Sequence, residues 1–178
     1  MKCPKCKNSD LFPIKLEEGL PAMGCKTCAG VLISLLYYRD WADRTLIEGE
    51  TEVPLPALVE DNDTKFVISC SKCSRMMTKY QISSQKSNRL NICVSCDDAW
   101  VDDGEWVLIK SLGLIKKIPA IFAEPWQSRI KQEISEKSRF ERLEKAVGPD
   151  DARRAKEVRG WLSSNTSKAS IIRYIGFE

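Results

Sequence analysis

The sequence predicts an α+β protein with two small β-hairpin blocks, each followed by a helix, and an α-helical C-terminal segment. All eight cysteines of the 178-residue chain lie in its first 96 positions, in four Cys-x-x-Cys pairs. From Gly113 onward there are no cysteines, and apolar residues recur at the spacing of amphipathic helices. The change in pattern separates the two kinds of structure.

The four cysteine pairs form an internal duplication. The two sets of four are Cys3, Cys6, Cys25 and Cys28, then Cys70, Cys73, Cys93 and Cys96. Eighteen residues separate the two pairs of the first set and 19 separate those of the second. When the chain is shifted so that Cys3 falls on Cys70, all four cysteines of the two sets therefore coincide to within one position, as expected for a repeated structural unit.

The spacing within each set favours a metal site with four thiolate ligands. Two residues between cysteines allow one tight turn to direct both sulfurs at one ion, and four thiolates close a tetrahedron with Zn–S distances of about 2.3 Å. We therefore expect two Zn²⁺ ions, one in each block. Disulfides and redox-active pairs are disfavoured in a reduced compartment without a βαβ pattern, which leaves iron as the main alternative.

Each block has only about 45–50 residues, too few for a self-sufficient hydrophobic core. Metal binding would supply the missing free energy of folding, so we expect the metal-free blocks to be largely unfolded.

The composition argues against an enzyme. The chain contains no histidine, which excludes a Ser-His-Asp triad, a Cys-His dyad and a histidine-ligated catalytic zinc. No glycine-rich phosphate loop is present, and a closed four-thiolate site leaves zinc no open position. The longest apolar run, residues 31–38, is too short to span a membrane, and the N-terminus has no apolar signal core. We therefore expect a cytoplasmic protein without membrane association.

Both blocks resemble a known family. The second block reads Cys70-Ser71-Lys72-Cys73, Cys93-Val94-Ser95-Cys96 and then Ala99-Trp100-Val101-Asp102-Asp103-Gly104-Glu105, and the first reads Cys3-Pro4-Lys5-Cys6 and Cys25-Lys26-Thr27-Cys28-Ala29-Gly30. These motifs resemble the transcription factor IIB type zinc ribbon of small bacterial proteins. The resemblance covers residues 1–47 and 66–115. It implies a tandem zinc-ribbon fold with four cysteine ligands in each ribbon, and nucleic-acid binding as an associated expectation.

Two departures from the family pattern stand out. Leu32 occupies the position of the family's tryptophan in the first block, and no Asp-x-Gly-Glu follows it. In the second block, Asp97 and Asp98 replace the two small residues that follow the last cysteine. The metal ligands are complete in both blocks.

We expect four regions: a first ribbon over 1–47, an acidic proline-containing linker over 48–65, a second ribbon over 66–118 and a basic helical region over 119–178. The segment that contains Tyr37, Tyr38 and Trp41 suits a short helix, and core packing is the favoured role of these aromatic residues over base stacking. The acidic cluster of Asp97, Asp98, Asp102, Asp103 and Glu105 is a candidate Mg²⁺ site, although helix capping or solvation is favoured.

The C-terminal region predicts helices over about 125–147, 150–162 and 167–174. Pro125 suits a first helical position, and Trp126, Ile130 and Ile134 follow at four-residue spacing. The last two predicted helices are similar to a helix-turn-helix, with polar residues Ser167, Lys168, Ser170 and Arg173 on the second helix. A plain helical hairpin is the favoured alternative, because helix-turn-helix matches are common in single sequences.

The excess of positive charge lies in the C-terminal part of the chain. Residues 1–109 carry 13 basic and 16 acidic side chains, whereas residues 110–178 carry 15 and 9, an excess of six positive charges. The candidate nucleic-acid contacts are Arg153, Arg154, Lys156, Arg159, Lys168 and Arg173. Alternating charges along 129–145 suit a solvated helix face equally well.

Two functions follow as hypotheses. The first is a zinc-binding adaptor, associated with nucleic acid or linked to transcription. The alternative is a protein–protein interaction module without nucleic-acid binding, in which exposed residues such as Leu11, Phe12, Met76 and Met77 dock a partner protein and the helices pair into a dimer. The sequence does not indicate an oligomeric state.

Overall fold

The computed structural model describes residues 1–45 and 64–176, so most of the expected acidic linker lies outside the described residues. The chain divides into two compact units, Met1–Ile130 and Lys131–Glu178. The first unit contains the cysteines and the sheet, and the second is helical. Residues 119–130 belong to the first unit, because Ile121 and Ile130 are buried and Trp126 packs on the same core.

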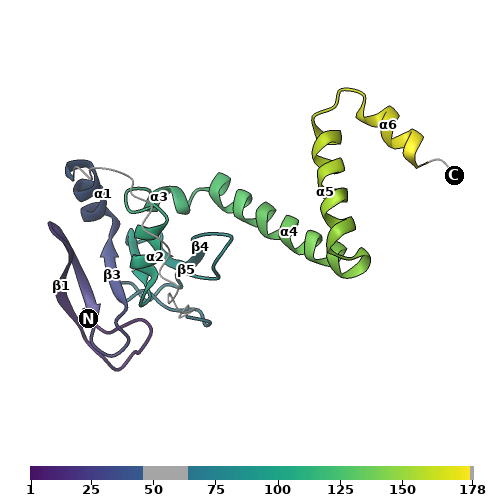
Figure 1. Cartoon of the computed structure of the whole chain (residues 1–178). Coiled ribbons are helices and arrows are strands. Elements are labelled where there is room, and N and C mark those ends of the chain that lie inside the picture. Colours follow the sequence, from purple (N-terminus) through teal and green to yellow (C-terminus); the bar gives the residue numbers. More distant parts are fainter. Residues whose placement is uncertain (46–63, 177–178) are drawn as a thin grey trace. The chain divides into compact units, whose positions relative to one another are not determined.

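The first unit contains one antiparallel six-stranded sheet (Figure 1). Its strands are β1 (Leu11–Glu17), β2 (Leu20–Cys25), β3 (Val31–Ser34), β4 (Thr78–Gln81), β5 (Arg89–Cys93) and β6 (Asp98–Val101). The strand order is β1-β2-β3-β6-β5-β4. Since β4, β5 and β6 repeat β1, β2 and β3 in the second block, this order is a palindrome. The two ribbons therefore share one sheet.

The third strands of the two ribbons join the halves of the sheet. Strands β3 and β6 pair antiparallel, with Leu32 opposite Trp100 and Val31 opposite Val101. Leu32 and Trp100 are equivalent in the duplication, because each lies seven positions after the first cysteine of its ribbon's second pair, Cys25 or Cys93. Equivalent residues thus face each other, and an approximate twofold axis passes through this pair.

The two faces of the sheet bury different sets of side chains, as the two-residue period of a strand requires. On one face, Ile33 of β3 and Ala99 and Val101 of β6 belong to a core that both ribbons build. On the other face, Leu32 and Trp100 pack in a second cluster with cysteines of both metal sites. Each ribbon therefore covers hydrophobic surface of the other.

Three short helices contribute to the shared core: α1 (Leu35–Arg44), α2 (Glu105–Ser111) and α3 (Ile118–Ile121). Tyr38 and Trp41 of α1 are buried, which agrees with a core role, whereas Tyr37 is 58% exposed. The Tyr38 hydroxyl donates a hydrogen bond to the Ile115 carbonyl at 2.8 Å, and the Trp41 indole donates to the Glu18 carbonyl at 2.9 Å. Both polar groups are thus satisfied inside the core.

The second unit contains most of α4 (Glu124–Val147), then α5 (Pro149–Ser163) and α6 (Lys168–Ile175). These ranges agree with the helices expected from the sequence to within one residue. Helix α5 begins at Pro149 because proline suits the first helical position. No helix among the described residues combines the length and the apolar character that crossing a membrane requires.

Packing in the second unit is sparse. Ala152 is the one fully buried residue among its described positions, 131–176. Ile134, expected on the packed face of α4, is 37% exposed, and Trp161 of α5 is 52% exposed. The four-residue spacing that buries Ile130 therefore does not continue into a core beyond the first unit. We call this unit, residues 131–176, the helical arm.

Candidate metal centres

Each cysteine pair lies in a tight turn of the same construction. The residue directly after the second cysteine has a left-handed backbone conformation in all four turns, with φ of 61° at Lys7, 54° at Ala29, 60° at Ser74 and 54° at Asp97. In the first turn of each ribbon, the N–H of Lys7 or Ser74 donates to the carbonyl of the first cysteine at 2.9 Å. Four equivalent turns show that the duplication extends to backbone conformation.

The turns bring the eight cysteines together in the two expected groups of four. In each group the four sulfur atoms lie within 4.8 Å of one another. The Sγ–Sγ distance is 3.7 Å between Cys3 and Cys28 and 3.5 Å between Cys73 and Cys93. A tetrahedron with metal–sulfur distances of about 2.3 Å has edges of about 3.8 Å. The sulfurs are thus spaced as ligands of a single ion.

The same distances exclude disulfides in this structure, because a disulfide requires an S–S distance of about 2.0 Å. All eight cysteines are free. In every pair the first cysteine is buried and the second is half-buried. Backbone N–H groups also point at the sulfurs, as from Cys6 to Cys3 Sγ at 3.3 Å and from Lys72 to Cys70 Sγ at 3.4 Å. These donors stabilise thiolates.

The thiols of the first cluster differ widely in acidity. Burial raises the pKa of Cys3 to about 11 and that of Cys28 to about 11. Burial opposes ionisation of Cys25 as well, but the backbone N–H groups of Cys28 and Thr27 outweigh it and lower its pKa to about 6.

The second cluster has the same asymmetry. The backbone N–H of Arg75 lowers the pKa of Cys73 to about 7, whereas the hydrogen bond with Cys73 and then burial raise the pKa of Cys96 to about 12. Without a cation, thiolates in one cluster repel one another, so ionisation of one sulfur, Cys25 or Cys73, opposes ionisation of its neighbours. A bound dication offsets this repulsion and allows all four sulfurs of a cluster to ionise.

A lysine stands beside each cluster at equivalent positions. Lys5 and Lys72 each lie inside the first cysteine pair of their ribbon, two positions after its first cysteine. The Lys5 ammonium contacts Asp102 Oδ1 at 3.1 Å, and the Lys72 ammonium contacts Asp98 Oδ1 at 2.8 Å. Burial alone would lower the pKa of each lysine, but the hydrogen bond with its aspartate and the attraction of nearby negative charges together outweigh burial and raise it.

The acidic cluster has structural roles. Asp98, Asp102 and Glu105 are fully buried, so solvation is the wrong expectation for these three. Asp102 accepts hydrogen bonds from the Trp100 indole at 3.0 Å and from the Thr64 N–H at 2.9 Å, in addition to the Lys5 contact. Glu105 accepts from the N–H groups of Arg89 and Asp102 at 3.2 and 2.8 Å. The oxygens of Asp102 and Glu105 are occupied by protein donors rather than arranged for Mg²⁺.

Two of the four residues expected to dock a partner are not available. Leu11 and Met77 are only 6% and 4% exposed, because both pack in the cluster beneath the cysteines. Met76 is 77% exposed, and Phe12 lies beneath the Lys26 ammonium at 5.2 Å. Alternation along extended chain explains the difference between Met76 and Met77, since neighbouring residues face opposite sides.

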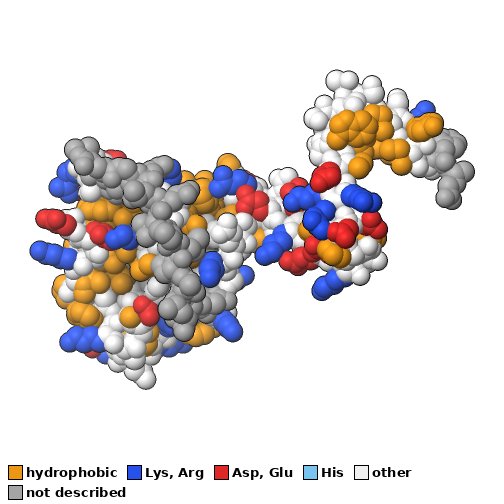
Figure 2. All heavy atoms as spheres, viewed as in Figure 1, with side chains coloured by type: hydrophobic (Ala, Val, Ile, Leu, Met, Phe, Trp, Pro, Cys, Tyr) orange, Lys and Arg blue, Asp and Glu red, His pale blue; other side chains and the backbone are white. Residues whose placement is uncertain are grey.

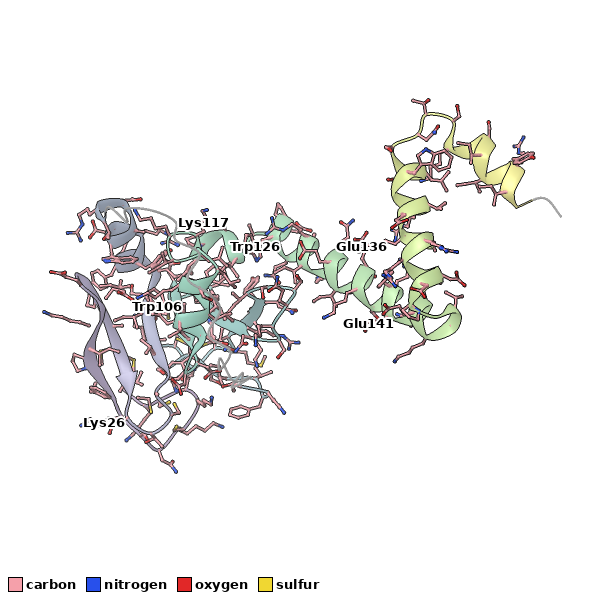
Figure 3. The ribbon with its side chains drawn as sticks, viewed as in Figure 1. Lys26, Trp106, Lys117, Trp126, Glu136 and Glu141 are labelled. Carbon is pink, nitrogen blue, oxygen red and sulfur yellow. The ribbon has the colours of Figure 1, made fainter. Side chains whose placement is uncertain are left out.

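The six candidate nucleic-acid contacts are all exposed on α5 and α6, but several have partners within the arm. Arg153 pairs with Asp150, and Arg154 lies 3.9 Å from Asp151. Arg159 contacts Glu136 of α4 at 3.5 Å, and Lys156 lies 5.2 Å from the centre of the Phe140 ring. Glu136 is labelled on α4 in Figure 3. Lys168 and Arg173 lie on the exposed surface of α6.

The sequence did not predict the ion pairs beside the clusters, although it named Asp98 and Asp102 as members of a candidate Mg²⁺ site. Lys5, Lys72, Asp98 and Asp102 interact across long stretches of chain, and only the equivalent positions of the two lysines signal them. Comparison of the chain with known protein families, curated protein sequences and solved structures finds no match. The resemblance to the transcription factor IIB type ribbon therefore stays a prediction.

Proposed function

We propose that the protein is a non-enzymatic adaptor whose two four-cysteine clusters each hold one structural Zn²⁺. The observation that supports it is the spacing of the sulfurs, within 4.8 Å in each cluster, around the position of a single tetrahedral ion. Zinc contributes no redox chemistry in such a site, and four protein ligands leave no position for a substrate. Its role is to stabilise the turns that precede β1, β3, β4 and β6.

Metal analysis of the purified chain tests this proposal. We expect two zinc equivalents per chain, and replacement by Co²⁺ should give the visible absorption of tetrahedral thiolate coordination. Cys28→Ser should remove one equivalent, whereas Ser9→Ala, on the same ribbon but outside the ligand set, should leave two. Full retention of structure without metal, or stoichiometric iron in the aerobically purified protein, would contradict the zinc proposal.

We propose that the adaptor's partner binds the helical arm. The exposed apolar surface of the arm favours a protein as this partner. Exposed apolar residues lie along α5 and α6, including Trp161, Ile172 and Tyr174 (Figure 2). Isolated polar helices gain little stability from their own backbone, and a unit with so little buried surface needs further apolar contacts. A partner protein bound to the arm would supply these apolar contacts.

Nucleic acid is the second candidate partner, favoured by the six exposed basic residues of α5 and α6. Titration with random double- and single-stranded oligonucleotides at two salt concentrations separates the candidates. Nucleic-acid binding predicts affinity that falls steeply with salt, and a smaller slope for the Arg153→Ala, Arg154→Ala, Arg159→Ala variant. Absence of binding at low salt would exclude the nucleic-acid function and leave the protein partner.

A further inference from the structure

A groove within the helical arm combines apolar side chains with charged ones. It has a volume of about 720 Å³ and lies between α4 and α5. Phe140 and Leu143 of α4 and Ala155 of α5 form its apolar part. Both Phe140 and Leu143 are half-buried, so these side chains meet solvent in the groove instead of a hydrophobic core.

The groove carries an excess of positive charge. Five basic and two acidic side chains line it, which leaves three positive charges in excess. One acidic residue, Glu136, already contacts Arg159 at 3.5 Å, and Lys156 lies over the Phe140 ring. Arg139 and Arg142 are exposed along the α4 side. The apolar surface is therefore bordered mainly by cations.

We propose that this groove binds an amphipathic helix of a partner protein that carries acidic side chains beside its apolar face. The inference rests on the proposed adaptor function and names the chemistry of its partner. Apolar side chains of the bound helix contact Phe140, Leu143 and Ala155, and its carboxylates meet Arg139 and Arg142. Helix-in-groove recognition of this kind uses apolar residues at spacings of three and four for affinity and charge for specificity.

The alternatives fit these observations less well. A nucleic-acid backbone is polar and would leave the apolar part of the groove without contacts. A membrane surface cannot follow a concave site. A second copy of the arm would bring its own excess of positive charge against this one, which opposes association.

Binding of synthetic peptides to the full-length, zinc-loaded chain tests the proposal. The probe is a fluorescent amphipathic peptide of about 18 leucine and glutamate residues, with leucines at helical spacing. Matched probes carry lysine in place of glutamate, or the same residues in a non-amphipathic order. Fluorescence anisotropy should show binding of the acidic amphipathic probe at least about tenfold tighter than binding of either matched probe.

Variants on one helix locate the site. The double substitution Arg139→Glu, Arg142→Glu should weaken acidic-probe binding by about tenfold or more. The matched control Lys131→Glu, Lys145→Glu makes the same charge change on α4 outside the groove and should alter binding less than about twofold. For the apolar contacts, Phe140→Ala should weaken binding, while Val158→Ala, on α5 outside the groove, should not. Circular dichroism measures the helix content of each variant. If Phe140→Ala fails to fold, the charge-reversal variant Arg139→Glu, Arg142→Glu tests the proposal by itself.

Three outcomes would overturn the inference. The first is equally tight binding of the lysine probe, and the second is no binding of the acidic probe. The third is a dimer of the chain that buries the groove and that the Arg139→Glu, Arg142→Glu substitution does not weaken. Zinc content, measured on every sample, separates the two proposals. If a chain with two zinc equivalents does not bind the acidic probe, only the peptide-binding proposal is contradicted. If the purified chain contains no zinc, the metal proposal is contradicted.

Discussion

At Gly30, the close approach of an indole ring determines which residue the chain accepts. A Cβ atom at this position would lie 2.2 Å from Cζ2 of Trp100. Such a distance is far inside van der Waals contact, and the ring is held by the hydrogen bond from its indole nitrogen to Asp102. The small residue after the second cysteine pair of the first ribbon is therefore required by the other ribbon.

Gly30→Ala should destabilise the first unit by about 1–3 kcal/mol, because an added methyl group in a packed site forces neighbouring atoms to move. The measurement is denaturant unfolding followed by tryptophan fluorescence. Gly160→Ala is the control, since a Cβ there has no neighbour within 4 Å. An unchanged midpoint for Gly30→Ala would show that Trp100 does not occupy this position in solution.

The acidity of the thiols predicts how metal binding depends on pH. At neutral pH, Cys3 and Cys28 keep their protons because their pKa values are about 11, whereas Cys25 is largely ionised with a pKa of about 6. The pKa of Cys6 is also raised, first by burial. Zinc must displace the retained protons, so its affinity should fall as the pH is lowered.

Calorimetry in buffers of different ionisation enthalpy counts the displaced protons. For the first cluster of the intact chain, with the second site kept loaded so that the shared sheet stays folded, we expect about three protons released for each zinc near pH 7.5. Release of about one proton or none would contradict the acidities derived from the structure.

At the level of the elements, strand pairing explains why the two ribbons differ in sequence. Leu32 and Trp100 face each other across the β3–β6 pair, near the approximate twofold axis. The residue equivalent to Gly30 in the second ribbon is Asp98, since each lies five positions after Cys25 or Cys93, and Asp98 is buried. A tryptophan at position 32 would therefore meet an aspartate where Trp100 meets a glycine.

The loop from β6 to α2 is held by Asp102, which joins the two ribbons through Lys5. Asp102→Asn should cost about 1.5–3 kcal/mol, since it removes the charge from a fully buried acceptor of three hydrogen bonds. Asp97→Asn is the control: the side chain of Asp97 is 45% exposed and pairs with Arg39, and loss of its charge should cost less than about 1 kcal/mol. Chemical denaturation measures both. Equal costs would mean that the buried network does not stabilise the ribbon pair.

For the whole molecule, the shared sheet predicts that the two metal sites stabilise each other's ribbon. Residues of both ribbons form the core that contains Ile33, Val101 and Trp106. Loss of either metal should therefore lower the stability of the whole first unit, which should still unfold in one cooperative transition.

Cys3→Ser and Cys70→Ser test this coupling. Each variant should lose one zinc and lower the unfolding midpoint of the entire sheet, with one transition in hydrogen exchange for β2 and β5 alike. Protection that is lost from the altered ribbon but kept at full strength in the other would show that the ribbons fold separately.

The sequence by itself determined the two groups of four cysteines, the duplication and the positions of the three C-terminal helices. A Cys-x-x-Cys turn and an apolar period depend on neighbouring positions, and the duplication is visible as a repeat of the cysteine spacing. The sequence predicted two separate ribbons, because the cysteine spacing does not indicate which strand edges pair with each other.

Only the tertiary structure decided that β3 meets β6, that Gly30 makes room for Trp100 and that Asp102 holds Lys5. The residues of each pair come from different ribbons, far apart in the sequence, and their interaction depends on packing that no local pattern encodes. The same reason applies to the helical arm, whose helices were predictable but whose apolar residues, such as Trp161, proved to be exposed. Local chemistry specifies the metal ligands, whereas burial depends on the surfaces that the folded chain brings together.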